Sequence, residues 1–165
     1  MKRITLIFIC ICAISISYGS QHSNITYKDS VPQKADSLVA FAKTLIGTTY
    51  KWGGTSPSTG FDCSGFCRYV FTNNAVKVPR TSASYGNYGT QIEKYQVRKG
   101  DVILFRGTDP KSKTIGHIGI VISNPGDPIM FIQCSSSKRH YGVVITDYEN
   151  SNYPNRFIKF MRVID

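Results

Sequence analysis

The first third of the chain has apolar residues at the spacing of an α-helix. The pattern begins at Ser30, has Pro32 in its first turn and ends before Gly47. Its apolar members are Ala35, Leu38, Val39, Ala42, Leu45 and Ile46. We therefore predict an amphipathic helix here, after a flexible polar lead-in at residues 20–33.

A second helical pattern begins near Asp62. In the stretch DCSGFCRYVF the apolar positions lie three or four residues apart, and Asn73 and Asn74 end the run. The segment before it, TTYKWGGTSPSTG, is rich in glycine, serine and proline and is expected to form turns. The first residues of this helix should therefore be exposed where a loop becomes a helix.

The second half of the chain changes to short β-rich runs separated by turn signals such as NPGDP. These runs are 101–105, 115–123, 129–134, 142–147 and 156–164. Helices followed by strands with short connections indicate an α+β fold, with N-terminal helices packed on a mainly antiparallel β-sheet. We expect one domain at residues 34–165, which is an ordinary size for a single core.

The first 19 residues have the pattern of a secretory signal peptide. A basic MKR start precedes an apolar run at 4–16 and small residues near Gly19, where we expect cleavage. A buried N-terminal strand or helix is the alternative, but it does not explain the basic start followed by an unbroken apolar run. A lipid-anchored form on Cys10 or Cys12 stays open, although bulky isoleucines precede both.

The formal net charge of the chain is +10, which favours anionic partners. The basic residues are scattered, so we expect no nucleic acid partner. An anionic cell envelope surface suits an exported protein better, and a role in solubility alone is the alternative. No second long apolar segment follows the signal, so we expect a periplasmic or extracellular protein, a monomer, with no transmembrane segment in the mature chain.

Cys63 and Cys67 lie four residues apart in the second predicted helix. At this spacing the Cβ atoms are about 5 to 6 Å apart, whereas a disulfide needs about 3.5 to 4.5 Å. Only Cys134 remains as a further cysteine after the signal, and neither a CxxC nor an HxxxH pair occurs. We therefore expect neither a disulfide framework nor a metal site.

Cys63 has the expected position of a nucleophile. In the first turn of a helix, unpaired N–H groups and the helix dipole stabilise a thiolate, and the same N–H groups can hold an oxyanion. Ser64 and Gly65 beside it leave space for a substrate. A small buried hydrophobe is the alternative for Cys63, and it is the expected role of Cys67.

His117 fits the role of a catalytic base. It begins an apolar strand between Gly116 and Gly119, which suggests that another group must come close to its ring. A satisfied core histidine is the alternative. His22 and His140 lie in polar segments and are expected to be solvated.

A base needs a partner on its second nitrogen, and Gln133 is a polar residue in the next predicted strand. If the NPGDP turn closes a hairpin, residues 117 and 133 fall roughly opposite one another. A surface residue on an edge strand is the alternative for Gln133. Paired with His117, Cys63 would form a thiolate–imidazolium ion pair whose activity falls at high pH.

Five blocks of the sequence together resemble the NlpC/P60 family of cell wall cysteine peptidases, over about residues 34–164. The blocks are YKWGGTSPSTGFDCSGF, PRTSASY, RKGDVILF, GHIGIVI and FIQCSSS. The resemblance implies a papain-like α+β fold and hydrolysis of amide bonds in peptidoglycan stem peptides, commonly between γ-D-glutamyl and a diamino acid. It also implies that Cys63 is the nucleophile, His117 the base and Gln133 the third polar residue, where many relatives have histidine.

The same resemblance implies a substrate cleft lined by Tyr50, Asp62, Ser64 and Ser82, and no cofactor. Tyr50 and Trp52 lie in the loop before the nucleophile, and packing of that loop onto the helix is their alternative role. Arg80 is expected to meet a substrate carboxylate or to form a surface salt bridge. Other functions stay open: a thiol amidase or acyltransferase on the same fold, or a non-catalytic cell wall binding protein.

Overall fold

The computed structural model describes residues 27–165. The predicted signal peptide and the first part of the lead-in lie outside the described residues, as does His22. The first helix, α1 (Tyr27–Thr44), begins earlier than predicted, so that residues 27–33 are helical and Pro32 lies inside the helix. Ile46, expected on the apolar face, lies beyond the end of α1 and is 50% exposed.

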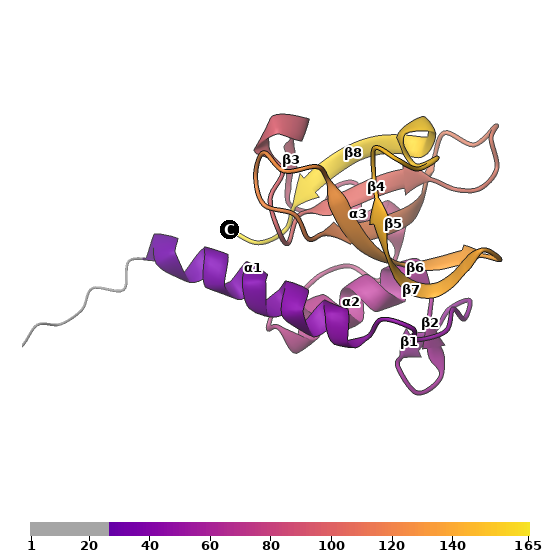
Figure 1. Ribbon diagram of the computed structural model, residues 1–165, viewed down its shortest axis with the longest axis horizontal. Helices are drawn as coiled ribbons and strands as arrows, with labels where there is room; N and C mark the ends of the chain where they lie inside the picture. The colour runs from indigo at the N-terminus through magenta and orange to yellow at the C-terminus, as the bar shows by residue number, and fades with distance from the viewer. Residues whose placement is uncertain (1–26) are drawn as a thin grey trace, which may run out of the picture.

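The second helix, α2 (Cys63–Asn73), begins and ends where the sequence predicts. All five predicted strands are present, and together with β3 they form one six-stranded sheet with the order β3-β8-β4-β5-β6-β7. Figure 1 labels these strands. Every pairing in it is antiparallel. The strands are β3 (Thr90–Ile92), β4 (Val102–Arg106), β5 (Ile115–Val121), β6 (Met130–Ser137), β7 (His140–Asp147) and β8 (Phe157–Arg162).

The sequence did not predict the shorter elements. They are β1 (Thr55–Ser56), β2 (Gly60–Phe61), α3 (Ser82–Tyr85), η1 (Lys94–Gln96) and η2 (Pro154–Arg156), together with β3 at the sheet edge. Each is two to four residues long, too short for a periodic pattern. The predicted class, α+β with helices on a mainly antiparallel sheet, is confirmed.

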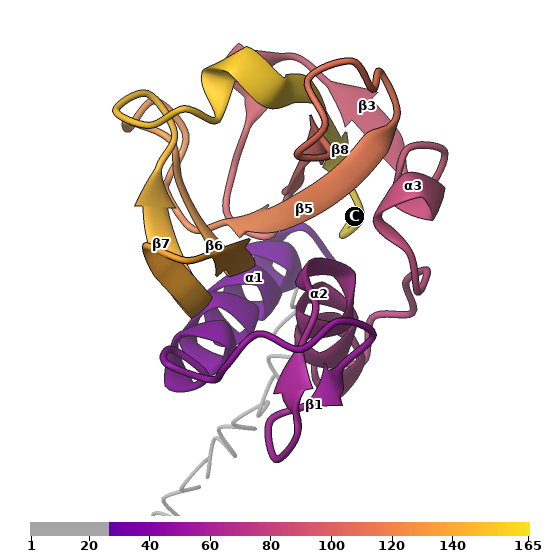
Figure 2. The same cartoon turned by 90° about the vertical axis from the view of Figure 1, so that its right-hand side faces the viewer.

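Two apolar clusters hold the layers together. The larger one joins α1 and α2 to one face of β4, β5 and β6, and includes the fully buried Phe66 and Phe71. The smaller one, around Phe105 and Phe131, fills the other face of the curled sheet. Figure 2 shows the sheet curling above α1 and α2. Complete burial of one such aromatic side chain contributes about 1.5–3 kcal/mol.

Strands β5 and β6 pair over a short distance only. Ile120 pairs with Ile132 and Val121 with Phe131, and the same register would set Ile118 opposite Cys134. Instead both residues contact the segment that leads into α2. The Cys134 thiol donates to the carbonyl oxygen of Phe61 at 3.1 Å, and the Ile118 N–H lies close enough to the Cys63 sulfur to lower the pKa of that thiol. The start of α2 is therefore fixed between two diverging strands.

Candidate active site

Asp62 fixes the first turn of α2. Its side chain accepts a hydrogen bond from the Gly65 N–H at 2.6 Å, and its backbone carbonyl accepts one from Phe66 at 2.9 Å. This N-cap satisfies one of the N–H groups that a helix leaves unpaired at its start. The N–H groups of Cys63 and Ser64 precede the first intrahelical bond and lie beside the sulfur.

Cys63 is half-buried, and the surroundings of its sulfur oppose a negative charge. Burial and then the Asp62 carboxylate raise the pKa of the thiol to about 11, and hydrogen bonds from the N–H groups of Ser64, Ile118 and Cys63 offset only part of this. The expectation of a thiolate stabilised by the helix start is therefore wrong for the free protein. Desolvation outweighs the helix dipole here.

The small residues after Cys63 serve packing. Ser64 is buried, and a Cβ on Gly65 would collide with the carbonyl oxygen of Gly54. The prediction that Gly65 leaves space for a substrate is wrong, because the backbone of the preceding loop fills that space. Glycine at position 65 lets this loop pack directly on the first turn of α2.

His117 and Gln133 are in direct contact. The Nε2 atom of His117 lies 2.5 Å from Oε1 of Gln133, and both side chains are buried. This confirms the predicted pairing and excludes an edge-strand surface position for Gln133, since β6 lies between β5 and β7. The observed pairing of β5 with β6, continued toward His117, sets His117 opposite Ser135 and not opposite Gln133. The expected register is therefore wrong by two residues. The contact is diagonal.

The hydrogen bond to Gln133 determines which nitrogen of His117 is available. An amide oxygen accepts only, so Nε2 carries the proton, and Nδ1 has the free lone pair. Because Nε2 is bonded to Gln133, Nδ1 is the atom left to face a thiol. The Cys63 sulfur lies near the backbone N–H of Ile118, the residue directly after His117, so the sulfur and the base flank the same backbone segment.

The glycines beside His117 have a different role from the one predicted. A Cβ on Gly116 would lie 2.7 Å from the Cα of Gly107, and one on Gly119 would lie 2.5 Å from the ring of Phe131. Both glycines therefore admit neighbouring parts of the protein. The expectation that they admit a group toward the imidazole is wrong.

Burial also controls the charge of His117. It lowers the pKa of the imidazole to about 4, the hydrogen bond to Gln133 opposes this, and the positive charge of Arg156 lowers the pKa further. His117 is thus neutral at pH 7. The free protein has a neutral thiol and a neutral imidazole, and the predicted ion pair is not its resting state.

Asp62, Ser64 and Arg80 form one network next to Cys63. Arg80 donates to both carboxylate oxygens of Asp62, at 2.7 and 3.1 Å, and to the Ser64 hydroxyl at 3.0 Å. Burial raises the pKa of Asp62, but the bonds from Arg80 and Gly65 outweigh it, so the pKa lies below its ordinary value. Of the two roles expected for Arg80, the salt bridge is observed.

Tyr50 lies near the sulfur, as the resemblance implies. Burial and then the charges of Cys63 and Asp62 raise the pKa of its phenol to about 12. Trp52, in the same loop, is 87% exposed, so it does not pack the loop onto the helix. Ser82 is the first residue of α3, an element that packs beside β5, and its place in a substrate cleft stays a prediction.

Comparison with known proteins identifies the domain. A sequence model of the NlpC/P60 family matches residues 47–162. The chain belongs to the NlpC/P60 family. It is 43% identical over 122 residues to the probable peptidoglycan endopeptidase LytE of Bacillus subtilis, covering 73% of this chain and 32% of LytE. It is 34% identical over 116 residues to the γ-DL-glutamyl hydrolase of Bacillus subtilis, covering 70% of this chain and 26% of that protein.

A solved structure agrees with this assignment. An NlpC/P60 family protein from Bacillus cereus superposes with a TM-score of 0.69 at 28% identity, over 79% of this chain and 40% of that one. The chain thus spans about a quarter to a third of the two Bacillus subtilis relatives. What it shares with all three proteins is the NlpC/P60 domain.

The sequence did not predict two residues of the NlpC/P60 site. The hydroxyl of Tyr153 donates to Oε1 of Gln133 at 2.6 Å, and Nε2 of Gln133 donates to Thr146 at 2.8 Å. The Tyr153 ring also stacks on His117, with ring centroids 5.7 Å apart. The available signal was weak: a single aromatic residue in the polar run NSNYPN.

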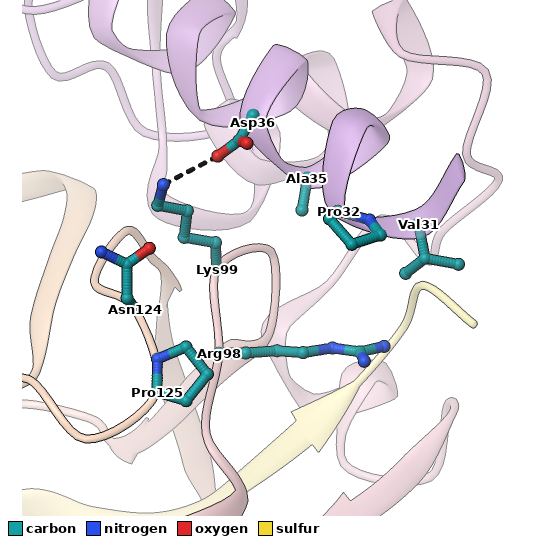
Figure 3. A pocket seen from close by; sticks show the side chains of 8 residues that line it. All are labelled: Val31, Pro32, Ala35, Asp36, Arg98, Lys99, Asn124 and Pro125. Carbon is teal, nitrogen blue, oxygen red and sulfur yellow. Dashed lines mark hydrogen bonds and ion pairs between the residues drawn. The ribbon is translucent and has the colours of Figure 1, made fainter. Parts of the chain in front are cut away.

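Two cavities of the NlpC/P60 domain differ in their relation to the site. A cavity of about 710 Å³ includes Gln133, Thr146, Tyr153 and Arg156 in its wall. Another, of about 190 Å³, lies between α1 and the turns at 98–99 and 124–125, and the ion pair of Lys99 with Asp36 lies in its wall (Figure 3). Only the first adjoins the His117–Gln133 pair.

Two further features of residues 27–165 bear on the predictions. No group of three or more His, Cys, Asp or Glu side chains in this part of the chain is arranged to hold a metal ion. None of its helices is long and apolar enough to cross a membrane. The thiols of Cys63, Cys67 and Cys134 are free, and Cys67 is fully buried as predicted.

Proposed function

We propose that this protein is an exported cysteine endopeptidase that hydrolyses amide bonds in peptidoglycan stem peptides, between γ-D-glutamyl and a diamino acid. The observation that carries the proposal is the position of Cys63 at the start of α2, near the backbone N–H of Ile118, while His117, the residue before Ile118, is hydrogen bonded to Gln133. The relatives named as a peptidoglycan endopeptidase and a γ-DL-glutamyl hydrolase support the choice of bond.

The proposed first step is attack by a thiol that loses its proton at the same time. Nδ1 of neutral His117 takes the proton of Cys63 as the sulfur attacks the scissile carbonyl, because neither group is charged in the free protein. The imidazolium then gives this proton to the leaving amine of the diamino acid. Water hydrolyses the resulting thioester, with His117 again as the base.

The start of α2 supplies the donors for the tetrahedral intermediate. The N–H groups of Cys63 and Ser64 precede the first intrahelical bond, so they are available to a developing oxyanion. In the same proposal, Tyr50, Asp62, Ser64 and Ser82 line the cleft and hold the stem peptide. Arg80 fixes the orientation of the Asp62 carboxylate through two hydrogen bonds.

Export and wall association complete the proposal. Residues 1–19 have the pattern of a cleavable signal, and the basic chain suits an anionic cell envelope surface. We expect the exported protein to act as a monomer in the periplasm or outside the cell.

The scissile bond is tested with defined muropeptides and mass spectrometry of the products. Cleavage after γ-D-glutamyl leaves a new amine on the diamino acid, whereas an amidase leaves an intact stem peptide with a free N-terminus. We expect the first product. Release of intact stem peptides would show that the protein is an amidase and not an endopeptidase. Binding to the wall without cleavage of any bond would indicate a binding protein.

A further inference from the structure

The imidazole determines on which side of the sulfur the leaving half of the substrate lies. In the proposed reaction His117 gives its proton to the leaving amine, so this amine must come within hydrogen-bond reach of the imidazole. The diamino acid therefore continues from Cys63 past His117. The next strand of the sheet on this side is β6, whose Gln133 contacts the imidazole.

The cavity of about 710 Å³ begins at this strand. Gln133 and Ser135, which lie on one face of β6, form part of its wall, and Tyr153 and Arg156 form another part. The ring of Tyr153 stacks on His117 with the ring centroids 5.7 Å apart. Ligand sites typically measure about 300–1,000 Å³. The cavity thus adjoins the imidazole and has room for the side chain of a diamino acid.

Arg156 is a fixed cation in the wall of this cavity. Its Nε and Nη2 atoms donate to the carbonyl oxygen of Arg106 at 3.3 and 2.9 Å, and its guanidinium lies 5.3 Å from the centroid of the Tyr153 ring. The carbonyl uses two of the five N–H groups. Neither contact carries a negative charge, and Arg156 forms no ion pair within residues 27–165. A carboxylate is the partner that suits such a guanidinium.

The acidic residues of the wall are bonded elsewhere. Asp147 accepts from the N–H and the side-chain amide of Asn150, both at 2.9 Å, and Glu149 pairs with Lys94 at 3.0 Å. The positive charge of Arg156 therefore acts on the imidazole nearby, where it contributes to the lowered pKa of the site's histidine. A bound carboxylate would offset this charge and favour the imidazolium that protonates the leaving amine.

Distance indicates which carboxylate of the substrate fits. The two spacings from the Tyr153 ring, 5.7 Å to His117 and 5.3 Å to Arg156, place the guanidinium at most about 11 Å from the imidazole. A carboxylate at the end of a side chain as long as that of lysine is six bonds from the leaving amine, about 7 Å when extended. With about 3 Å for a hydrogen bond, it covers nearly this whole range. The α-carboxyl group, two bonds from the amine, covers only the near half.

We propose that Arg156 binds the side-chain carboxylate of the diamino acid, so that the enzyme prefers stem peptides in which this residue is a diamino dicarboxylic acid. The inference rests on the proposed function, which supplies the leaving half. It deepens that function by naming the class of diamino acid. A diamino acid that ends in an amine alone, such as lysine, or one whose side-chain carboxylate is amidated, lacks the group that Arg156 binds.

The test compares three synthetic stem peptides that differ only after γ-D-glutamyl. This residue is a diamino dicarboxylic acid, its side-chain amide or lysine, and a C-terminal amide removes the other carboxylate of the leaving half. We expect wild type to show a kcat/KM about tenfold or more higher for the first peptide, the effect of a charge-assisted hydrogen bond. Arg156→Gln should remove this preference, and Arg156→Lys should keep part of it. Arg68→Gln, on the exposed side of α2, is the matched control and should keep it fully.

The ratio of rates within one variant is independent of how much of that variant is folded. A preference that survives in Arg156→Gln would overturn the proposal. Equal rates for all three peptides in wild type would do the same, as would a preference that Arg139→Gln removes equally, since the exposed Arg139 lines the same cavity.

A binding measurement separates this proposal from the proposed cleavage. The probe is the α-amide of the diamino dicarboxylic acid, titrated into Cys63→Ala protein and followed by NMR. We expect Arg156→Gln in the same background to raise the Kd about tenfold or more, and an unchanged Kd would contradict the proposal. Binding that depends on Arg156 without cleavage of any peptide would keep this site and refute the endopeptidase. Cleavage without preference would keep the endopeptidase and refute this site.

Discussion

Burial determines the charge of both reacting groups at the residue scale. The first turn of α2 offers N–H groups to the sulfur, yet the pKa of Cys63 is raised to about 11, and that of His117 is lowered to about 4. The helix dipole gives typically 0.3–1 kcal/mol, whereas desolvation of a buried ion costs more. A neutral thiol and a neutral imidazole therefore replace the thiolate–imidazolium pair in the free protein, and in the proposed mechanism the proton moves during attack.

The neutral pair predicts how alkylation of Cys63 depends on pH. Because the thiolate is the reactive form, the rate with iodoacetamide should rise about tenfold per pH unit from pH 6 and level off only near the thiol pKa of about 11. The site of alkylation is read by mass spectrometry of the labelled peptide. Cys63→Ala protein, whose other two described thiols are buried, is the control.

The same pair predicts a broad pH range for catalysis. His117 is a base above its pKa of about 4, and Cys63 keeps its proton below about 11. The hydrolysis rate should change little between these values. Fast alkylation at pH 6, or a loss of activity between pH 7 and 9, would contradict the neutral pair and support a thiolate–imidazolium ion pair.

Sequence patterns predicted His117 and Gln133 because each is polar where the pattern calls for an apolar residue, and they predicted Cys63 by its position. His117 and Gln133 lie in β-rich runs, and Cys63 lies where a loop becomes a helix. Tyr153 escaped prediction because its contact with Gln133, 20 residues away in sequence, depends on the path of an irregular segment. The pKa values were also out of reach, because they depend on burial rather than on neighbours in sequence.

At the scale of elements, the N-cap of α2 joins the helix start to the Arg80 network. Asp62 accepts from Gly65 and from Arg80 through the same carboxylate. Asp62→Ala removes the cap, and we expect a loss of about 1–2 kcal/mol in the free energy of unfolding. Asp62→Asn keeps an acceptor for Gly65 and should lose less. Urea denaturation of both variants measures the difference.

The charge of Asp62 gives this comparison a pH dependence. Its pKa in the folded protein lies below the ordinary value of 3.8, so its ionised form stabilises the fold above that value and the contribution is lost as the pH falls. The gap between wild type and Asp62→Asn should therefore shrink on acidification below about pH 4. A gap that stays constant down to pH 2 would mean that the Arg80 bond contributes nothing to stability.

The sequence predicted the long helices and strands, but it did not predict that β5 and β6 diverge. Hydrophobic periodicity located α2 and all five long strands. The register of β5 and β6 was taken as continuous, whereas the Phe61–Cys63 segment separates Ile118 from Cys134. No pattern within either strand reports this separation, because it arises from a segment more than fifty residues earlier in the chain.

At the scale of the whole molecule, the net positive charge, which remains after Lys2 and Arg3 leave with the predicted signal, predicts weak, salt-dependent attachment to an anionic wall. Cys63→Ala protein should sediment with purified sacculi at low ionic strength and be released by about 0.5 M salt, since salt screens exposed charges. Sacculi stripped of anionic polymers are the matched control. Sedimentation that is the same at low and high salt would contradict a charge-based attachment.

The central claim is that one sulfur at the start of α2 cleaves a wall peptide with the help of His117. The most direct test measures the rate of amide hydrolysis in a defined muropeptide for wild type, Cys63→Ala and Cys67→Ala, each assayed well below its unfolding temperature. We predict a loss of at least about a thousandfold for Cys63→Ala and near-normal activity for Cys67→Ala, whose thiol is buried one turn further on. Equal rates for wild type and Cys63→Ala would contradict the account.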